Sequence, residues 1–424
     1  MSGFFEQAKS KVCLSEGTHA TMRPLVSTWE QRKLGEVAHR VIRKNEGNQS
    51  DLPLTISAQH GLVDQRDYFN NQVASRDMSG YYLLENGEFA YNKSTSSDSP
   101  WGAIKRLTKY EKGCLSTLYI CFGLDQGDPD FLVTYYETNR WHGAVQMIAA
   151  EGARNHGLLN IAPDDFLETA LTLPCSTEEQ KQIGCFFTQL NSLITLHQRK
   201  YDKLAQLKKS MLDKMFPKPG ERFPEIRFAG FTDPWEQRKL GNCGTSYGGL
   251  TGKTKEDFGH GSARFIPYTN VFDNPLTDTK RLEAVEIDSS QNQVAYGDVF
   301  FTVSSETPDE VGMSSVWLSD QEDVYLNSFC FGYRQDSTFD PHYLAYMLRS
   351  SSVRSNLTPL AQGISRFNIS KNKVMELNVP VPSVVEQKQL GQYFTKLDSL
   401  ITLHQRKLEL LRNTKKSLLD RMFV

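Results

Sequence analysis

The stretch of this chain that comes nearest to a catalytic motif is a glycine cluster, GNCGTSYGGLTGKT, at residues 241–254. It ends like a phosphate-binding loop, whose pattern G-x-x-x-x-G-K-[ST] holds phosphate oxygens with the backbone N–H groups of a glycine-rich turn. That pattern requires a glycine where this chain has Tyr247, and no clear apolar strand precedes the cluster. We therefore interpret the cluster as a loop and not as a nucleotide site.

Other residue patterns that carry chemistry are absent or weak. The sequence contains no N-P-P-Y or D-P-P-Y of amino-methyltransferases, no H-E-x-x-H and no G-x-S-x-G. Asp164 and Asp165 lack the basic partner that a nuclease or glycosidase site would supply, so they indicate a solvated turn. His197 and His404 are expected to be hydrogen-bonded imidazoles rather than metal ligands. The seven cysteines form no C-x-x-C pair, which predicts reduced thiols. The sequence thus predicts no catalytic and no metal-binding residue.

Two copies of one segment organise the chain. Residues 179–216 and 386–423 align without gaps at an offset of 207 and agree at 25 of 38 positions, including the run Leu193 to Lys200 against Leu400 to Lys407. Apolar residues recur in each copy every three or four positions, which is the 3.5-residue period of a coiled coil. No proline interrupts either copy. Each copy is therefore predicted to be one long helix.

The apolar residues at these positions form the predicted packing seam of the two helices. An ordinary core-facing helix has a similar stripe, but matching polar breaks in both copies favour helices that pair with each other or with a partner's helices. His197 and His404 lie at the midpoints of the copies, so antiparallel pairing would bring them together. The seam residues predicted to bind a partner are Ile183, Phe187, Leu190, Ile194, Leu204, Leu390, Phe394, Leu397, Ile401 and Leu411.

A second repeat begins each half of the chain. The heptapeptide WEQRKLG occurs at residues 29–35 and again at 235–241, an offset of 206. Its tryptophan and leucine are expected to pack on a hydrophobic surface. Between this anchor and the helix lie 143 residues in the first half and 144 in the second, which match in length and largely differ in sequence. The repeated anchor and the repeated helix, which together we call the frame, therefore flank two domains of different sequence.

The two variable regions predict strands joined by loops. Short aromatic and β-branched runs such as TLYICFGL (117–124) and VFFTVSS (299–305) are separated by Gly, Asn, Asp and Ser. With the two long helices, this pattern predicts an α+β protein with an internal repeat. The predicted parts are a leader (1–27), a first variable domain (28–176), a central helix (177–217), a linker with a second variable domain (218–383) and a C-terminal helix (384–424).

Charge and composition limit the class of protein. The 424 residues are 39% hydrophobic with a net charge of −2, and no apolar run approaches the length of a membrane span. The first residues lack the continuous hydrophobic region of a signal peptide, so we expect a cytoplasmic protein. The helix copies hold seven basic against three acidic residues and eight against four, a net +8 that leaves −10 for the remainder. Any contact with nucleic acid is therefore expected to be local, or shared with another subunit.

Candidate recognition residues lie in loops at corresponding places in the two halves. NGEFAYN (86–92) parallels YGDVFFT (296–302), and each half closes on a glycine-containing loop, EGARNHGLLNI (151–161) or QGISRFNI (362–369). Two unlike domains on matching frames could read two different base sequences, and reading base edges needs side chains with directional donors and acceptors. The DNA-binding candidates are Asn92, Lys93, Ser94, Arg154, Asn155 and His156 in the first half, with Thr302, Ser304, Ser305, Arg366 and Asn368 in the second.

This order of variable region and E-Q-led helix, repeated and opened each time by WEQRKLG, resembles the specificity subunit of type I restriction-modification systems. The resemblance covers residues 28–424; the leader departs from it, because it lacks the FPEIRFAGF that precedes the second anchor. It implies an α+β fold in which two α/β target-recognition domains are joined by two long helices forming an antiparallel coiled coil, with a pseudo-two-fold repeat. Each domain would read one half of a bipartite DNA site, with the helices setting the spacing.

The resemblance also implies the partners. Two modification subunits would methylate adenines, and restriction subunits, which are motor-nucleases, would cut unmodified DNA. S-adenosylmethionine, ATP and magnesium would belong to those partners, with no cofactor in this chain. Two alternatives remain open from the residues alone. One is a scaffold whose coiled coil joins two ligand-binding domains without a DNA role, and the other, a self-contained restriction enzyme or methyltransferase, is weakened by the missing motifs.

Overall fold

The computed structural model describes residues 28–57, 61–69, 75, 77–97, 99–149 and 157–423. The predicted leader therefore lies outside the described residues. The chain divides into two units, one formed by Met1–Leu196 with Leu408–Val424 and the other by His197–Lys407. Among the described residues, no helix combines the length and the apolar character needed to cross a membrane.

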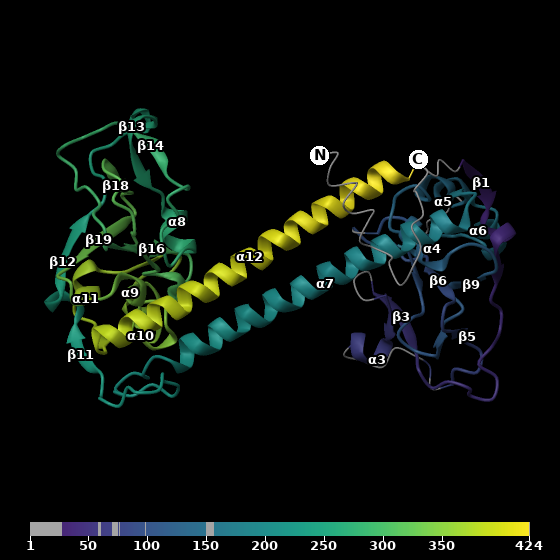
Figure 1. The fold of residues 1–424 in the computed structure, drawn as a ribbon, viewed down its shortest axis with the longest axis horizontal. Helices are drawn as coiled ribbons and strands as arrows, with labels where there is room; N and C mark the ends of the chain where they lie inside the picture. Colours follow the sequence, from purple (N-terminus) through teal and green to yellow (C-terminus); the bar gives the residue numbers. More distant parts are fainter. Residues whose placement is uncertain are drawn as a thin grey trace, which may run out of the picture. The chain divides into compact units, whose positions relative to one another are not determined.

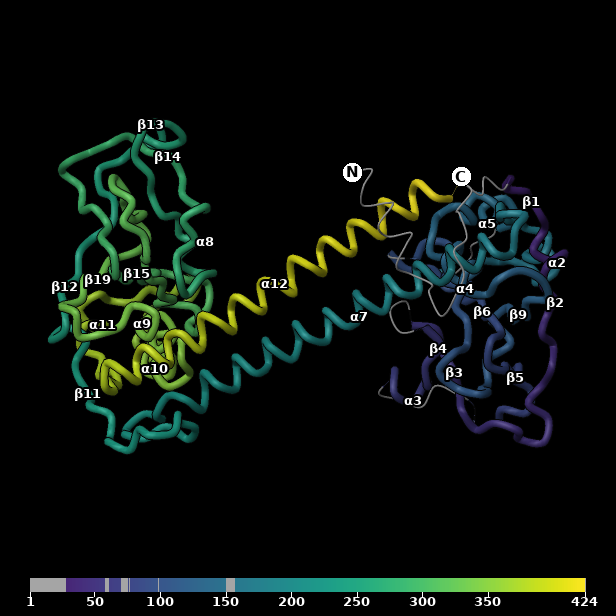
Figure 2. Tube along the Cα trace, in the orientation of Figure 1, coloured from purple at the N-terminus to yellow at the C-terminus, as the bar shows by residue number. Residues whose placement is uncertain are grey.

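The first unit is built around an antiparallel four-stranded sheet of order β2-β9-β6-β7, with β1-β10, β3-β4 and β5-β8 as separate pairs. Figure 2 shows β3, β4 and β5 at one end of this unit and β1 and α5 at the other. Its elements are β1 (Trp29–Lys33), α2 (Leu34–Val37), β2 (Ala38–Arg40), β3 (Leu54–Ser57), β4 (Gly61–Asp64), α3 (Gln65–Tyr68), β5 (Tyr82–Glu85), β6 (Phe89–Asn92), β7 (Ala103–Arg106), β8 (Lys112–Leu115), β9 (Ile120–Leu124), α4 (Pro129–Tyr135), α5 (His142–Ile148), α6 (Pro163–Leu167), β10 (Ala170–Pro174) and the start of α7 (Thr177–Lys214).

The second unit repeats this plan with a sheet of order β12-β19-β15-β17 and a frame pair β11-β21, and it adds the sheet β14-β13-β18, which lies away from α12 (Figure 1). Its elements are β11 (Glu236–Lys239), η1 (Leu240–Asn242), β12 (Gly244–Gly248), η2 (Lys255–Asp257), β13 (Phe258–Ile266), α8 (Tyr268–Asp273), β14 (Glu283–Val285), β15 (Val299–Thr302), β16 (Ser304–Ser305), η3 (Pro308–Glu310), β17 (Ser314–Val316), β18 (Val324–Leu326), β19 (Cys330–Gln335), α9 (Pro341–Met347), α10 (Ser351–Leu357), η4 (Thr358–Leu360), β20 (Phe367–Asn368), α11 (Lys371–Met375), β21 (Asn378–Val381) and α12 (Val384–Met422).

The dipeptide Glu-Gln recurs near the start of both long helices, and the structure shows why. In the first unit, the Gln180 side chain accepts a hydrogen bond from the backbone N–H of Asp128 at 2.9 Å and donates one to the Pro174 carbonyl at 2.8 Å. In the second unit, Gln387 bonds in the same way to Asp340, at 2.8 Å, and to Pro382, at 3.0 Å. Both aspartates cap the short helix that follows them. Each glutamine therefore fixes a long helix to the capped end of a short one.

The repeated glycine four residues later permits close packing of the same two helices. A Cβ atom at Gly184 would lie 2.5 Å from the backbone nitrogen of Phe131 in α4. A Cβ atom at Gly391 would lie 2.7 Å from the backbone nitrogen of Tyr343 in α9. Real Cβ atoms do not approach backbone this closely, so the sequence E-Q-K-Q-x-G is the contact surface between a long helix and its own domain.

Each unit also contains the far end of the other long helix. In the first unit, Phe423 lies just beyond α12, and its ring centroid is 5.7 Å from that of Trp29 and 6.4 Å from that of Phe187 near the start of α7. In the second unit, Phe216 follows α7, and its ring centroid is 5.8 Å from that of Phe394 near the start of α12. Within each unit the end of one helix packs on the start of the other, so the helices run antiparallel as predicted.

Candidate nucleic-acid interface

The two candidate loops of each half lie side by side. In the first unit, Ser94 forms a β-bridge with Leu158, and the N–H of Leu159 donates to the Lys93 carbonyl at 2.9 Å. In the second unit, β16 pairs with β20 so that Ser304 lies opposite Asn368. Both pairings have the same offset of 210 between the halves, so the structure joins the segment after the central sheet strand to the glycine loop in both domains. This places the predicted recognition segments at equivalent sites.

The first-half candidates differ in what they can contact. Ser94 is exposed and lies two residues after Asn92, whose side-chain oxygen accepts a hydrogen bond from the Ser94 N–H at 3.0 Å. The Lys93 ammonium donates to the Ile161 carbonyl at 3.2 Å, and burial lowers the pKa of Lys93. The Lys93 side chain therefore stabilises the loop through a hydrogen bond on its buried side. The candidates Arg154, Asn155 and His156 lie outside the described residues.

Burial corrects three of the second-half candidates. Thr302, Ser304 and Ser305 are all less than a tenth exposed. The Thr302 hydroxyl accepts from the Met313 N–H at 3.0 Å, and the Tyr268 hydroxyl donates to the Ser304 carbonyl at 2.6 Å. Thr302 lies in β15 opposite Cys330, and Ser304 and Ser305 form β16, which pairs with β20. This burial contradicts the prediction that the three side chains contact bases. They shape the loop instead.

The remaining second-half candidates are on the surface. Arg366 and Asn368 are both exposed, and both belong to the loop that ends in β20. The contact with bases that we predict for them stays a prediction. They lie in the segment that pairs with β16, which corresponds to the segment that pairs with Ser94 in the first unit.

Sequence patterns did not identify the arginine that fixes the neighbouring loop. Arg354 of α10 donates hydrogen bonds to the carbonyls of Asp309, Val311 and Gly312 at 2.6 to 2.9 Å, and burial lowers the pKa of Arg354. The loop between β16 and β17 is therefore tied to a helix through three of its carbonyls. An isolated arginine in a helical stretch carries no sequence signal for this role.

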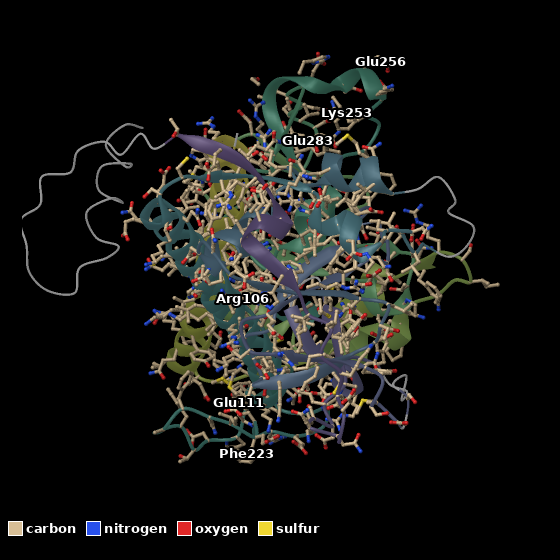
Figure 3. All side chains as sticks on the ribbon, turned by 90° about the vertical axis from the view of Figure 1, so that its right-hand side faces the viewer. Arg106, Glu111, Phe223, Lys253, Glu256 and Glu283 are labelled. Atoms are coloured by element: carbon tan, nitrogen blue, oxygen red, sulfur yellow. The ribbon has the colours of Figure 1, made fainter. Side chains whose placement is uncertain are left out.

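The glycine cluster is not a phosphate site. The Lys253 ammonium lies 3.0 Å from the Asp288 carboxylate, and hydrogen bonds from Ser290 and Lys253 lower the pKa of Asp288. The three-residue turn η2 follows the cluster where a phosphate loop would need a helix. Figure 3 shows Lys253 together with Glu256 and Glu283 at one end of the domain. The interpretation as a loop is wrong for part of the cluster, because Gly244–Gly248 form β12, which pairs with β19 in the four-stranded sheet.

The other residues considered for chemistry also have structural partners. Asp164, which we predicted to lack a basic partner, accepts a hydrogen bond from Arg40 at 3.3 Å; this corrects that prediction, although the pair is on the surface and contributes little. Cys114, Cys121, Cys175, Cys243 and Cys330 are free thiols. Within the described ranges, no group of three or more histidine, cysteine or acidic side chains could hold a metal ion.

The two seam histidines meet as predicted. The Nδ1 atoms of His197 and His404 are 2.8 Å apart, and their ring centroids are separated by 5.0 Å. A hydrogen bond at this distance requires one ring to donate and the other to accept, so at least one Nδ1 is unprotonated. Burial lowers the pKa of His197, and the charges of His404, Lys407 and Lys200 lower it further. The pair therefore favours a state with at most one proton between the two Nδ1 atoms.

The predicted partner-binding seam is mostly used inside the chain. The side chains at the start of each helix are buried in the core of their own domain, which leaves them no surface for another subunit. These are Ile183, Phe187, Leu190, Leu390, Phe394 and Leu397. The other four, Ile194, Leu204, Ile401 and Leu411, are half-buried. The prediction of partner binding is therefore contradicted for the six buried side chains and stays a prediction for the four half-buried ones.

Comparison with known proteins shows which chains this one is similar to. Residues 232–413 match the family model described as the type I restriction modification DNA specificity domain. The StySPI specificity subunit of Salmonella potsdam is 25% identical over 171 residues, which cover 39% of this chain and 36% of that protein. The MjaVIII specificity subunit of Methanocaldococcus jannaschii is 20% identical over 294 residues, covering 62% of this chain and 63% of that protein. The chain thus spans about one third to two thirds of the length of these relatives.

The fold is similar to that of a solved specificity subunit. The crystal structure of a type I restriction-modification S subunit from M. genitalium matches with a TM-score of 0.54 at 14% identity, covering 95% of this chain and 98% of that one. These comparisons confirm the resemblance to specificity subunits of type I restriction-modification systems and the α+β fold with an internal repeat. The alternative of a scaffold without a DNA role is not favoured.

Proposed function

We propose that this chain is the DNA sequence-recognition subunit of a type I restriction-modification complex. Each variable domain reads one half of a bipartite target, and the two long helices set the distance between the halves and dock two modification subunits. The chain itself is non-catalytic. S-adenosylmethionine for adenine methylation, and ATP with magnesium for the restriction subunits, bind to those partners.

The similarity of residues 232–413 to a DNA specificity domain carries this proposal. The first half lies outside that match, but it has the same frame. Its β1-β10 pair corresponds to β11-β21, and its bridge between Ser94 and Leu158 corresponds to that between Ser304 and Asn368. Two domains that share a frame but differ in their loops can recognise a target made of two different half-sites.

The exposed faces of the helices support docking of two identical partners. Leu193 and Leu196 of α7 are both 46% exposed, and the equivalent Leu400 and Leu403 of α12 are 36% and 45% exposed. All four belong to the run that is identical in both copies. Packing within the chain does not explain identity at exposed apolar positions, whereas two equivalent docking sites for one kind of subunit would. The net +8 of the helix copies adds attraction for acidic partner surfaces or DNA phosphates.

Methylation mapping tests the proposal. We would coexpress the chain with modification subunits of its host in cells that lack other adenine methyltransferases and sequence their methylated DNA. A single bipartite motif with methylated adenine in both parts is expected, and it should vanish when this chain is omitted. A continuous motif, or methylation that does not depend on this chain, would contradict the proposal.

The chain alone provides the second part of the test. Purified without partners, it should neither transfer methyl groups from S-adenosylmethionine nor cleave DNA. Exchange of Leu193, Leu196, Leu400 and Leu403 for glutamate should prevent copurification of modification subunits, while the same exchange at exposed Leu118 in the first domain should not. Equal loss from both variants would refute docking through the helices.

A further inference from the structure

The loop that leads into β20 is closed as a tight hairpin. The backbones of Gln362 and Asn368 exchange two hydrogen bonds, of 2.9 Å and 2.8 Å. Gly363 has φ of 145°, and a Cβ atom there would overlap the carbonyl oxygen of Arg366. Only glycine allows this turn. The loop is also fixed from its other side, because Phe367 pairs with Ser305 of β16. Its tip is thus held in one conformation by two sets of backbone contacts.

This hairpin presents an apolar side chain to solvent. Ile364 is 97% exposed, more than any other large hydrophobic residue among those the structure describes. Isolated exposed apolar residues are ordinary, but here the closed backbone prevents the side chain from folding back onto the domain. Ser365 and Arg366 beside it are also exposed. Within the described part of the chain, the Arg366 guanidinium has no carboxylate partner.

An isoleucine between polar and cationic side chains suits one kind of surface. Isoleucine can neither donate nor accept a hydrogen bond, so the only base feature that it can distinguish in the major groove is the 5-methyl group of thymine. Arginine beside it can bind a guanine edge or a phosphate. The same hairpin carries Arg366 and Asn368, the two second-half candidates that are exposed.

On the basis of the proposed function, we propose that Ile364 determines specificity by packing against the methyl group of one thymine in the second half-site. The hairpin places the side chain before binding, so no ordering of the loop is needed. Burying one methyl-sized group changes a binding constant about four-fold. Ile364 therefore selects an A·T pair at one position, while Arg366 holds the adjacent base or phosphate.

Deoxyuridine substitution tests this contact, because uracil differs from thymine only in lacking the methyl group. Once methylation mapping gives the motif, each thymine of the second half-site is replaced singly by deoxyuridine in a duplex. The complex of this chain with its modification subunits is then titrated with each duplex. We expect affinity to fall about four-fold at one position and to stay unchanged at the others. Ile364→Ala should bind the unmodified duplex about four-fold more weakly and should not respond to deoxyuridine at that position.

The matched control is Ile287→Ala, which removes another exposed isoleucine of the same unit, 57% accessible, outside this loop. It should keep wild-type affinity and wild-type sensitivity to deoxyuridine. The inference is overturned if wild-type complex binds every substituted duplex equally, or if Ile364→Ala stays as sensitive as wild type. A loss of DNA bending in Ile364→Ala without a deoxyuridine effect would also overturn it, because the side chain would then act as a wedge between base pairs. Absence of any methylated bipartite motif would instead refute the proposed function itself.

Discussion

Acidification should weaken the helix pair at His197 and His404. The folded state lowers the pKa of His197 below its usual value of about 6.5, first by burial and then by the positive charges of His404, Lys407 and Lys200. The unfolded chain therefore binds more protons than the folded chain when the pH lies between the lowered pKa and about 6.5. By linkage, this contribution to stability is present above pH of about 6.5 and is lost as the pH falls through the lowered pKa.

The magnitude follows from the geometry. With ring centroids 5.0 Å apart, two imidazolium charges repel by about 1 kcal/mol at the dielectric constant of water and by about 3 kcal/mol at an effective value of about 20. Protonation of both rings also removes the hydrogen bond between their Nδ1 atoms. For a unit of this size, a loss of about 1 kcal/mol lowers Tm by about 2 to 4 °C. The effect should shrink in high salt, because the pair is only half-buried.

Thermal unfolding followed by circular dichroism between pH 7.5 and 5 measures this effect. His404→Gln keeps a donor and an acceptor for His197 and removes one charge, so its Tm should fall less over this range than that of the wild type. The same measurement in high salt serves as the control, because screening of the ring charges should bring the wild-type slope closer to that of His404→Gln. If wild type and His404→Gln lose the same Tm on acidification, the two rings do not repel each other in the folded state.

Three further experiments test the packing of the long helices on their domains and the independence of the two variable domains. Gly391→Ala gains up to about 1 kcal/mol of helix propensity but forces a Cβ atom against Tyr343, which costs about 1 to 3 kcal/mol, so urea unfolding should show a net loss. Phe216→Ala should lower the stability of the second unit and Phe423→Ala that of the first, each by about 3 to 5 kcal/mol; limited proteolysis would identify the unit that opens, and the same fragments from both variants would contradict this. Exchange of residues 38–170 for those of a relative should change one methylated half-site, and a change in both would show that the readers are not independent.

Sequence periodicity predicted the helices well because a gapless repeat constrains two segments at once. The contact between His197 and His404 followed from their equal positions in the two copies and from antiparallel pairing. The partner-binding role of the seam failed at Phe187 and Phe394 for a physical reason. Both stripes cover a domain of the same chain, and a sequence pattern shows that a helix face is apolar without showing what covers it.

Prediction of the recognition residues was limited in a different way. Thr302, Ser304 and Ser305 have the right chemistry for base contacts, but all three are buried. Thr302 lies in the central sheet, and the pairing of β16 with β20 joins Ser304 and Ser305 to a segment about 60 residues further along the chain. Local sequence carries little information on such non-local pairing. Arg366 and Asn368 stayed on the surface because they lie in the hairpin itself. Burial, more than residue type, separates the two groups.

In each domain, the residues that repeat attach the domain to its long helix, and the residues that vary form the loops. Gln180 and Gln387 make the same backbone bonds at the start of each long helix, and these bonds do not involve the loops beside Ser94 or Ser304. A change in those loops therefore leaves the attachment of domain to helix intact. The glutamines and glycines near the start of the long helices contact backbone atoms, and backbone chemistry is the same whatever side chains the domain carries. These residues therefore stay the same in both halves. The loops are free to differ, and it is there that two domains with one frame can acquire two different binding specificities.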